Sequence, residues 1–407
     1  MSIGEQEANR LRVLKAIRRA EPVSRIELVE RAGLPSQAIS ELVAELLCRD
    51  LLREEKMPPA GRGRPRIQLR LNPRAAYVVG AFLSPDRSLG IDIANLRGDQ
   101  LFERSFRLRH LKSLEAVAER IASNLEETIS AGPLAKSAIH SVGLGLPAVV
   151  DGLRGVVHWM PGYLPRPVPF AALIEERLGL PVFLDSAADI LARAEHWFGD
   201  DHQVDDFTLI LVGLGIGLGQ YEDGLLRIGQ HGMSPAFAHV KVPPGHGPLC
   251  VCGAQGCLMT YASMSGVVGR LSHLRGLPTP HLEQMLEVFH AFAREACAGD
   301  VRSLEIFDFA GHALGLAVAN YINIWDPLRL VVIIEDAVFA DMIAASFRAS
   351  VTANTLPALR DRASVQIRAS EKLAFSKGAA ALVLERLYRG SGAATGGRTG
   401  VSAPLTR

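Results

Sequence analysis

The spacing of apolar residues along the chain changes at Asn72-Pro73, and this change constrains the fold more than any other feature. Before it, apolar residues recur at helical spacing. After it, short apolar runs of strand length alternate with amphipathic stretches of helical length. The 407-residue chain is 48% apolar, which is enough to fill more than one core. We therefore expect a small domain over residues 1–72, a larger α/β domain over 76–390, and a disordered Gly, Ser, Ala and Thr-rich tail over 391–407.

The charge is distributed unevenly between these parts. Residues 1–75 carry 15 Lys and Arg against 10 Asp and Glu, although the whole chain has a net charge of only +1. A basic N-terminal segment followed by a mildly acidic remainder is typical of a polyanion-binding domain joined to another domain. No apolar run reaches the roughly 18–20 residues of a membrane span, and the N-terminus lacks the apolar segment of a secretory signal. We expect no membrane association and a cytoplasmic location.

The first 50 residues follow the pattern of a helix-turn-helix. One helical rhythm ends before Pro22, a second helix can begin after Ser24, and Gly33 allows a tight turn. A third helix is predicted from Ser36 to about Asp50. In such units the N-terminal residues of the last helix reach base edges. The predicted base-contacting residues are Ser36, Gln37 and Ser40. The alternative is a plain three-helix bundle.

A turn-rich basic loop follows this unit and runs into the alternating strand Ile67–Leu71. A loop closing on a strand directly after a helix-turn-helix is typical of a wing, and guanidinium groups suit the negative potential of a narrow minor groove. The predicted wing contacts are Arg62, Arg64 and Arg66. The alternative is a solvated basic linker. The pattern favours a winged helix-turn-helix that binds a double-stranded DNA operator.

Three of the five cysteines lie within eight residues, Cys250, Cys252 and Cys257. Glycines between them allow the backbone to bend so that three thiolates face one centre, which favours a structural zinc site in a reducing compartment. A fourth ligand must come from elsewhere, and His246 is near in sequence. The alternative is three free or oxidised thiols. Cys48 and Cys297 have apolar neighbours and are expected in the core.

Several motifs, in this order, resemble the ROK family of repressors, open reading frames and sugar kinases. The resemblance is carried by Gly143–Pro147 with Asp151, Gly213–Gly219, Asp223-Gly224, His239 with Cys250–Cys257, and Leu314–Pro327. It covers essentially the whole chain, including the DNA-binding head of the repressor branch. It implies a two-lobed actin-like, hexokinase-like body and a fourth zinc ligand at His239. Because such regulators bind two half-sites, we expect a homodimer or a homotetramer.

The same resemblance shows that the kinase residues are missing. The family's Asp-x-Gly-Gly-Thr strand end is replaced here by a segment ending at Ser84, and the catalytic Asp falls on Ala187, which cannot accept a proton. The adenosine-side Gly-Gly pair is replaced by Ile333-Ile334. We therefore predict that the chain is not an enzyme, and a sugar kinase is the least favoured function.

The sugar-binding positions of the family are also altered. They fall on Ser186, Ala187, Ala236, His239 and Met259, and His239 alone matches the family residue. An effector, a sugar or a sugar-derived compound, is expected between the lobes. The predicted effector-binding residues are Pro147, Asp185, Ser186, Asp189 and His239.

The predicted function is that of a DNA-binding transcriptional regulator, a repressor of a carbohydrate or related catabolic operon with a catalytically dead effector domain. The alternative is a non-catalytic protein-binding scaffold, or a sequestered regulator without a small-molecule effector. The basic loop at residues 62–66 distinguishes the two, because a scaffold does not need it.

Overall fold

The computed structural model describes residues 3–57, 66–109, 111–199, 204–242, 247–369 and 374–389, and the tail at 391–407 lies outside them. The chain forms two compact units. The smaller unit contains Met1–Ala76, Asn95–Arg97 and the chain from Val383 onward. The larger unit contains Tyr77–Ala94 and Gly98–Leu382.

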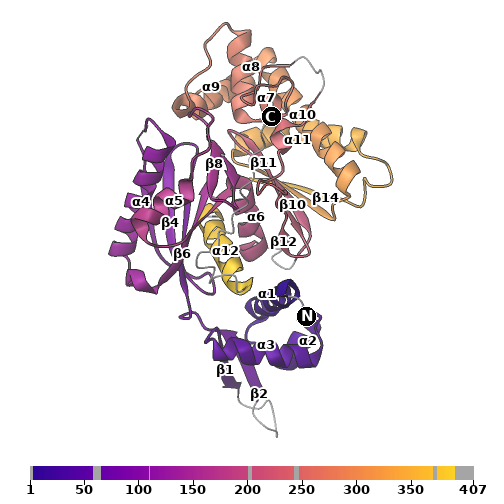
Figure 1. Ribbon diagram of the computed structural model, residues 1–407. Helices are drawn as coiled ribbons and strands as arrows, with labels where there is room; N and C mark the ends of the chain where they lie inside the picture. The colour runs from indigo at the N-terminus through magenta and orange to yellow at the C-terminus, as the bar shows by residue number, and fades with distance from the viewer. Residues whose placement is uncertain are drawn as a thin grey trace, which may run out of the picture. The chain divides into compact units, whose positions relative to one another are not determined.

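The N-terminal part of the smaller unit contains three helices and a two-stranded hairpin (Figure 1), and the end of the last described helix, from Val383, also belongs to this unit. Its elements are α1 (Ile3–Ala20), α2 (Arg25–Ala32), α3 (Ser36–Cys48), β1 (Leu52–Met57) and β2 (Arg66–Leu71). The apolar rhythm of α1 places Leu11, Leu14 and Ile17 in the core. The three helices and β2 therefore begin and end close to where the sequence pattern predicts them.

Strand β1 is the element of this unit that the sequence pattern did not indicate. It pairs antiparallel with β2, from Leu52 opposite Leu71 to Met57 opposite Arg66. Charged residues make up most of β1, so its apolar alternation is weak, and pairing with β2 is what makes it a strand. The hairpin has the form of a wing.

The larger unit contains two five-stranded sheets with the same topology. The first sheet has the order β5-β4-β3-β6-β9 and the second has the order β12-β11-β10-β13-β14. In each sheet, three strands that are consecutive in the sequence form one side. Two later strands extend the sheet from the first of these three, and both run parallel to it. The strands of the first sheet are β3 (Tyr77–Leu83), β4 (Ser88–Asn95), β5 (Gln100–Arg107), β6 (Ile139–Leu146) and β9 (Val182–Ser186). Those of the second are β10 (Phe207–Val212), β11 (Ile216–Glu222), β12 (Leu225–Leu226), β13 (Arg329–Ile334) and β14 (Ser364–Ala369). This duplication defines two lobes.

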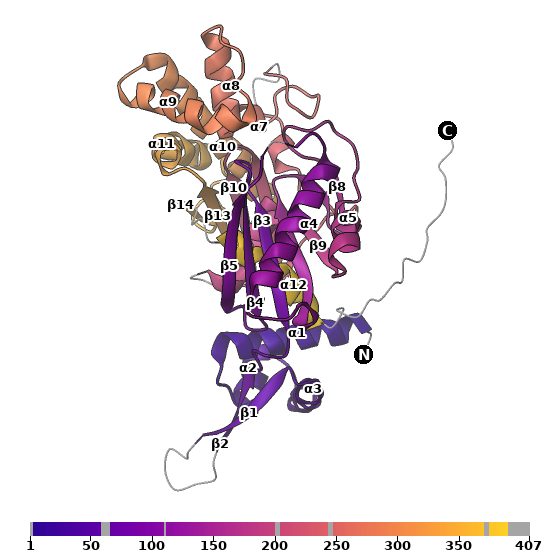
Figure 2. The ribbon, with the colours of Figure 1, turned by 90° about the vertical axis from the view of Figure 1, so that its left-hand side faces the viewer.

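Helices cover the outer face of each sheet. In the first lobe, α4 (Leu114–Ala131) and α5 (Phe170–Leu178) pack on the sheet through one apolar core (Figure 2). In the second lobe, α10 (Val301–Trp325) and α11 (Ala337–Asn354) lie side by side on the sheet. The second lobe also carries α7 (Met259–Ala262), α8 (Met264–Leu274) and α9 (Met285–Cys297). None of the helices in the described residues is long and apolar enough to span a membrane.

Short elements complete the larger unit: the 3₁₀ turns η1 (Lys136–Ala138), η2 (Phe237–His239) and η3 (Leu282–Gln284), and the hairpin of β7 (Val149–Asp151) and β8 (Val156–Trp159).

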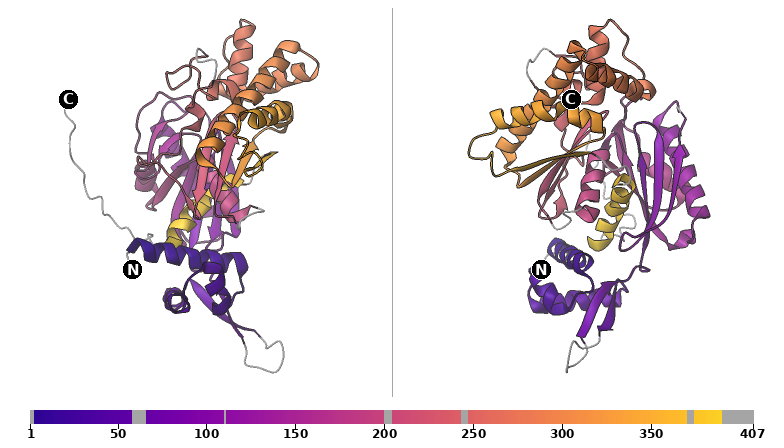
Figure 3. Two further views of the ribbon diagram at one scale, coloured as in Figure 1. Left: turned by 90° about the vertical axis from the view of Figure 1, so that its right-hand side faces the viewer. Right: turned by 180° about the vertical axis from the view of Figure 1, so that it is seen from behind.

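Two helices, α6 (Ala187–Phe198) and α12 (Ala374–Arg389), lie between the sheets (Figure 3). Their contact is very close, since a Cβ atom added at Gly378 would lie 2.0 Å from the carbonyl oxygen of Ile190. A Cβ at Gly80 of β3 would lie 2.2 Å from the carbonyl oxygen of Ser376. The rings of Phe82 and Phe375 stack with centroids 4.1 Å apart. This crossing joins the two lobes through closely packed backbone.

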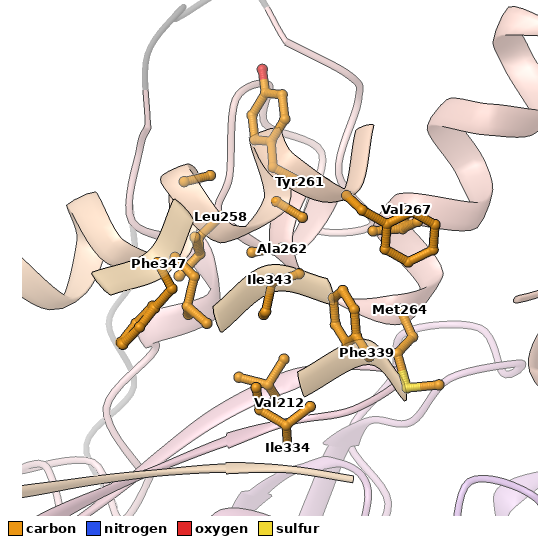
Figure 4. Packing of buried hydrophobic residues seen from close by; sticks show 14 of the residues in the cluster. Val212, Leu258, Tyr261, Ala262, Met264, Val267, Ile334, Phe339, Ile343 and Phe347 are labelled. Atoms are coloured by element: carbon orange, nitrogen blue, oxygen red, sulfur yellow. The ribbon is translucent and has the colours of Figure 1, made fainter. Parts of the chain in front are cut away.

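The core of the second lobe anchors the segment that follows the cysteine loop (Figure 4). Side chains from the ends of β10 and β13, from α7 and α8, and from α11 meet there. They include Val212, Leu258, Tyr261, Ala262, Met264, Val267, Ile334, Phe339, Ile343 and Phe347. Because Leu258 is fully buried directly after the last cysteine of the loop, the loop is attached at that end to a rigid core.

Candidate functional site

The turn between α2 and α3 is held by local interactions. Ser24 caps α2 with a capping box: its hydroxyl oxygen accepts from the backbone N–H of Glu27, and the Glu27 carboxylate accepts from the backbone N–H of Ser24 at 2.8 Å. Gly33 ends the helix in the left-handed region, with φ of 61°. These contacts set the direction in which α3 leaves the turn.

The first turns of α3 present polar side chains to solvent. Ser36, Gln37 and Ser40 are exposed, whereas Ile39 and Val43 on the same helix are buried. The Gln37 amide donates to Glu41 Oε1 at 3.0 Å, and the Ser40 hydroxyl donates to the Ser36 carbonyl oxygen at 2.9 Å. The Gln37 amide retains a second N–H and its carbonyl oxygen for a base edge. The structure thus brings these three predicted residues together on one exposed surface.

The predicted wing residues are only partly described. Arg62 and Arg64 lie outside the described residues, in the segment 58–65 that joins β1 to β2. Arg66 is the first residue of β2, and only its backbone is described. The hairpin stem that carries them is supported by ion pairs, Arg25 to Glu54 at 2.8 Å and Arg70 to Glu55 at 2.5 Å.

A second site lies in the larger unit, where one histidine and three cysteines converge. The ligand atoms of His239, Cys250, Cys252 and Cys257 all lie within 4.8 Å of one another. Cys252 Sγ lies 3.6 Å from Cys257 Sγ, and Cys250 Sγ lies 3.6 Å from His239 Nδ1. Ligands of a tetrahedral zinc ion, at about 2.0–2.3 Å from the metal, lie about 3.5–3.8 Å apart. The side chains therefore fit a structural zinc ion.

The loop reaches this geometry through its glycines. Gly253 and Gly256 have φ of 85° and 72°, a region that side chains with a Cβ disfavour. The backbone N–H of Cys250 donates to the carbonyl oxygen of Ala254 at 2.8 Å, which closes a tight turn. His246, the other candidate for the fourth ligand, lies outside the described residues.

The electrostatics of the cluster suit a cation. Burial, and secondarily the charge of Lys241, lower the pKa of His239, so that its imidazole stays in the neutral, metal-binding form. Burial raises the pKa of the Cys250 thiol to about 11. A bound metal ion would displace that proton. Lys241 Nζ donates to Cys257 Sγ at 2.9 Å, and its positive charge would offset the net charge of −1 that three thiolates leave around a bound Zn²⁺ ion.

The two remaining cysteines are not core residues. Cys48 and Cys297 are both exposed, so the expectation from their apolar neighbours was wrong. Cys48 lies off the buried stripe of α3 formed by Ile39, Leu42, Val43 and Leu46, and Cys297 is the last residue of α9.

A cavity of about 320 Å³ lies between the two lobes of the larger unit. Three of the predicted effector residues, Pro147, Ser186 and His239, line it. Since His239 also belongs to the cysteine cluster, the wall of the cavity and the metal site share one side chain. Most of the remaining lining is apolar, and Met259 packs over the turn at Gly215.

Asp185 and Asp189 do not line this cavity. Asp185 forms a buried ion pair with Arg193 at 3.1 Å. Asp189 is buried in the first turn of α6, where it accepts hydrogen bonds from the hydroxyls of Ser186 and Ser234. Burial, followed by the charge of Asp185, raises the pKa of Asp189 well above its usual value.

The reason lies in the local geometry. Successive residues of β9 point to opposite sides, so Ser186 faces the cavity while Asp185 does not. Ser186 is also the N-cap of α6, and its hydroxyl accepts from the backbone N–H of Asp189, which turns the Asp189 side chain back beneath the cap. Both carboxyl groups thus lie behind Ser186, on the side away from the cavity.

Glu335 is a cavity residue that the sequence analysis missed. It follows β13 directly, and its carboxylate accepts a hydrogen bond from the backbone N–H of Leu214. A Cβ atom at Gly213 would lie 1.8 Å from Glu335 Oε2, so a larger residue at 213 would force the Glu335 side chain to move. Burial raises the pKa of Glu335. A carboxyl group therefore occupies the space above the glycine turn at 213–215. The sequence could have indicated Glu335, because it directly follows a buried parallel strand and ligands of α/β sheets bind at the carboxyl ends of such strands.

One segment of the second lobe closes over the first. Leu282 of η3 reaches a small apolar pocket formed with Leu83, Leu108 and Met160. Beside it, Glu283 pairs with Arg87 at 3.2 Å. Leu282 also lines the cavity, so this segment connects the two lobes at the cavity wall.

Together these features define a two-lobed actin-like protein with an N-terminal winged helix-turn-helix and a cysteine-histidine cluster beside its interlobe cavity. The chain belongs to the ROK family, whose family model matches residues 94–386.

Its relatives include named repressors. It is 27% identical over 386 residues to the DNA-binding transcriptional repressor Mlc of Escherichia coli strain K12, covering 93% of each chain. It is 25% identical over 349 residues to the putative xylose repressor of Caldicellulosiruptor sp. strain Rt8B.4, covering 84% of this chain and 87% of that one. A solved structure of a ROK family transcriptional regulator, a homologue of the E. coli Mlc protein, matches with a TM-score of 0.75 and 26% identity, covering 95% of this chain and 98% of that one. The predicted fold and the predicted family are confirmed.

Proposed function

We propose that this protein is a DNA-binding transcriptional regulator, a repressor of a carbohydrate or related catabolic operon, and not an enzyme. The observation that carries the proposal is the exposed polar turn of α3 beside a wing hairpin, in a chain similar over 93% of its length to a DNA-binding repressor. The carbohydrate assignment is supported by the similarity to a putative xylose repressor.

On DNA, α3 enters the major groove with Ser36, Gln37 and Ser40 toward the bases, and Arg62, Arg64 and Arg66 of the wing reach the minor groove. We infer a homodimer or homotetramer, because two half-sites require two copies of α3. We also infer that the protein acts in the cytoplasm.

The body serves as the effector domain. An effector binds between the lobes against Pro147, Ser186 and His239, while Asp185 and Asp189 lie behind Ser186. The zinc ion is structural, since three cysteines and one histidine leave no position open for a substrate. Because His239 belongs to both sites, the metal holds part of the effector wall in place. To change DNA affinity, the effector must favour one lobe arrangement over another.

Several residues argue against phosphoryl transfer. Ala187 lines the cavity where the resemblance requires a catalytic Asp, and Ile333 and Ile334 fill the interior of β13. The side chain of Glu335 occupies the space above the glycine turn and leaves less room there for a nucleotide phosphate. A kinase needs a base and a phosphate cradle together, and both are compromised here.

A gel-shift assay tests the proposal. The full-length protein is titrated onto promoter DNA from upstream of its own gene, with a shuffled duplex of equal length and composition as competitor. We expect the protein to form a complex with labelled promoter DNA. Unlabelled promoter DNA should displace the label from this complex at least tenfold more effectively than the shuffled duplex does. Gln37→Ala should reduce this preference, whereas Gln6→Ala at an exposed position of α1 should not. Binding that ignores sequence, or no binding at low salt, would contradict the regulator function.

A further inference from the structure

The lining of the interlobe cavity indicates which class of molecule fits it, and this inference rests on the proposed effector function. We propose that the effector is a compact molecule with an apolar ring or chain and at most two or three polar groups, and not a free sugar.

Apolar side chains dominate the described wall. They come from both lobes, including the segment of the second lobe that contains η3 and α9. They include Phe82, Trp159, Leu214, Ile216, Met259 and Met285. A cavity of about 320 Å³ that is partly open to solvent and lined by aromatic, aliphatic and thioether groups favours a ligand that loses little hydration on entry.

Most polar groups in the wall already have partners. The hydroxyl of Ser186 bonds with Asp189 and Ser234, and the hydroxyl of Ser265 donates to the carbonyl oxygen of Leu214 at 2.6 Å. These two hydroxyls therefore have little capacity left for a ligand.

Three wall side chains among the described residues remain with capacity for a ligand, His239, Glu335 and Trp159, whose indole N–H can only donate. His239 approaches the cysteine cluster through Nδ1, which leaves the other ring nitrogen as a donor or acceptor. Glu335 accepts one backbone N–H and has lone pairs to spare. Two or three polar groups of a ligand can therefore be matched.

A free sugar does not meet this condition. Each of its hydroxyls both donates and accepts, so most would enter the cavity without a partner. Each unpaired hydroxyl should weaken binding about tenfold. Ala187 and Met259 stand at wall positions where the family resemblance requires carboxylates, and neither side chain can bond a hydroxyl.

A matched pair of six-membered rings tests the inference. Cyclohexanol carries one hydroxyl, and myo-inositol carries one on every carbon. Binding to the full-length protein is measured by titration calorimetry and by the fluorescence of Trp159, with Trp159→Phe identifying the part of the signal that comes from the cavity. We expect cyclohexanol to bind at least about 100-fold more tightly than myo-inositol, glucose or xylose.

Met259→Glu should reverse the preference, because it restores a carboxylate to the wall. Met259→Leu, which keeps an apolar side chain of similar size, should leave it unchanged. Met259 is only partly buried, and circular dichroism would show whether each variant folds. If Met259→Glu does not fold, Met259→Gln gives the same comparison without a charge.

Equal binding of the two rings, tighter binding of myo-inositol or a sugar, or binding of neither would overturn the inference. The gel-shift assay is independent of these outcomes. If the promoter complex forms while the ring preference is absent, the proposed function stands and the inference about the effector fails.

Discussion

The crossing of α6 and α12 between the lobes allows a quantitative test of the packing. Gly378 of α12 and Gly269 of α8 are both interior helical glycines. A Cβ at Gly378 would lie 2.0 Å from the carbonyl oxygen and 2.9 Å from the carbonyl carbon of Ile190, whereas a Cβ at Gly269 would have no neighbour within 4 Å. Both changes to alanine add the same atoms to a helix, so packing is the main difference between them.

The magnitudes follow from these contacts. Alanine in place of a helical glycine stabilises by about 1 kcal/mol. Overpacking opposes this by about 1–3 kcal/mol, and the upper end applies at Gly378 because the obstructing atoms are backbone and α6 itself must shift. Gly269→Ala should therefore raise the free energy of unfolding by about 0.5–1 kcal/mol. Gly378→Ala should lower it by about 1–2 kcal/mol, after its propensity gain is subtracted.

Urea unfolding followed by circular dichroism measures both variants against the parent protein, and a melting curve gives a second readout. One kcal/mol corresponds to about 2–4 °C in a domain of this order of size. If Gly378→Ala is as stable as the parent, or gains as much as Gly269→Ala, the two central helices do not approach each other as closely as described here.

Three further predictions concern the two sites and the buried carboxyl pair. Arg64→Ala should weaken operator binding and reduce the slope of log K against log salt by about 1, measured by gel shift at several salt concentrations; an unchanged slope would exclude a phosphate contact. The purified protein should contain one zinc ion per chain by elemental analysis, and Cys257→Ser should lose it and melt at a lower temperature; absence of metal from the parent would refute the site. Because burial raises the pKa of Asp189, its contribution to stability is fully present below its unfolded pKa near 3.8 and is lost as the pH rises toward the folded value. Asp189→Asn should therefore gain stability relative to the parent as the pH rises from 4.5 to 7 in urea unfolding; the opposite pH trend would show that Asp189 is ionised in the fold.

Features that depend on a few neighbouring residues could be predicted from the sequence. The cap at Ser24, the left-handed turn at Gly33 and the strand Phe207–Val212 arise from contacts within about one helical turn or from strict apolar runs, and they form where predicted. The cysteine spacing likewise predicted a loop whose three sulfur atoms converge, because glycines between them decide its bend.

Features that depend on distant segments required the tertiary structure. The pairing of charged β1 with β2, the common topology of the two sheets, and the place of Glu335 against Gly213 all depend on which segments meet. The side that Asp189 faces was decided by the cap of α6 and the packing around it, not by its residue type. Local hydrogen bonding and side-chain periodicity are encoded over a few residues, whereas the burial of a carboxyl group or the lining of a cavity is set by the elements packed around it.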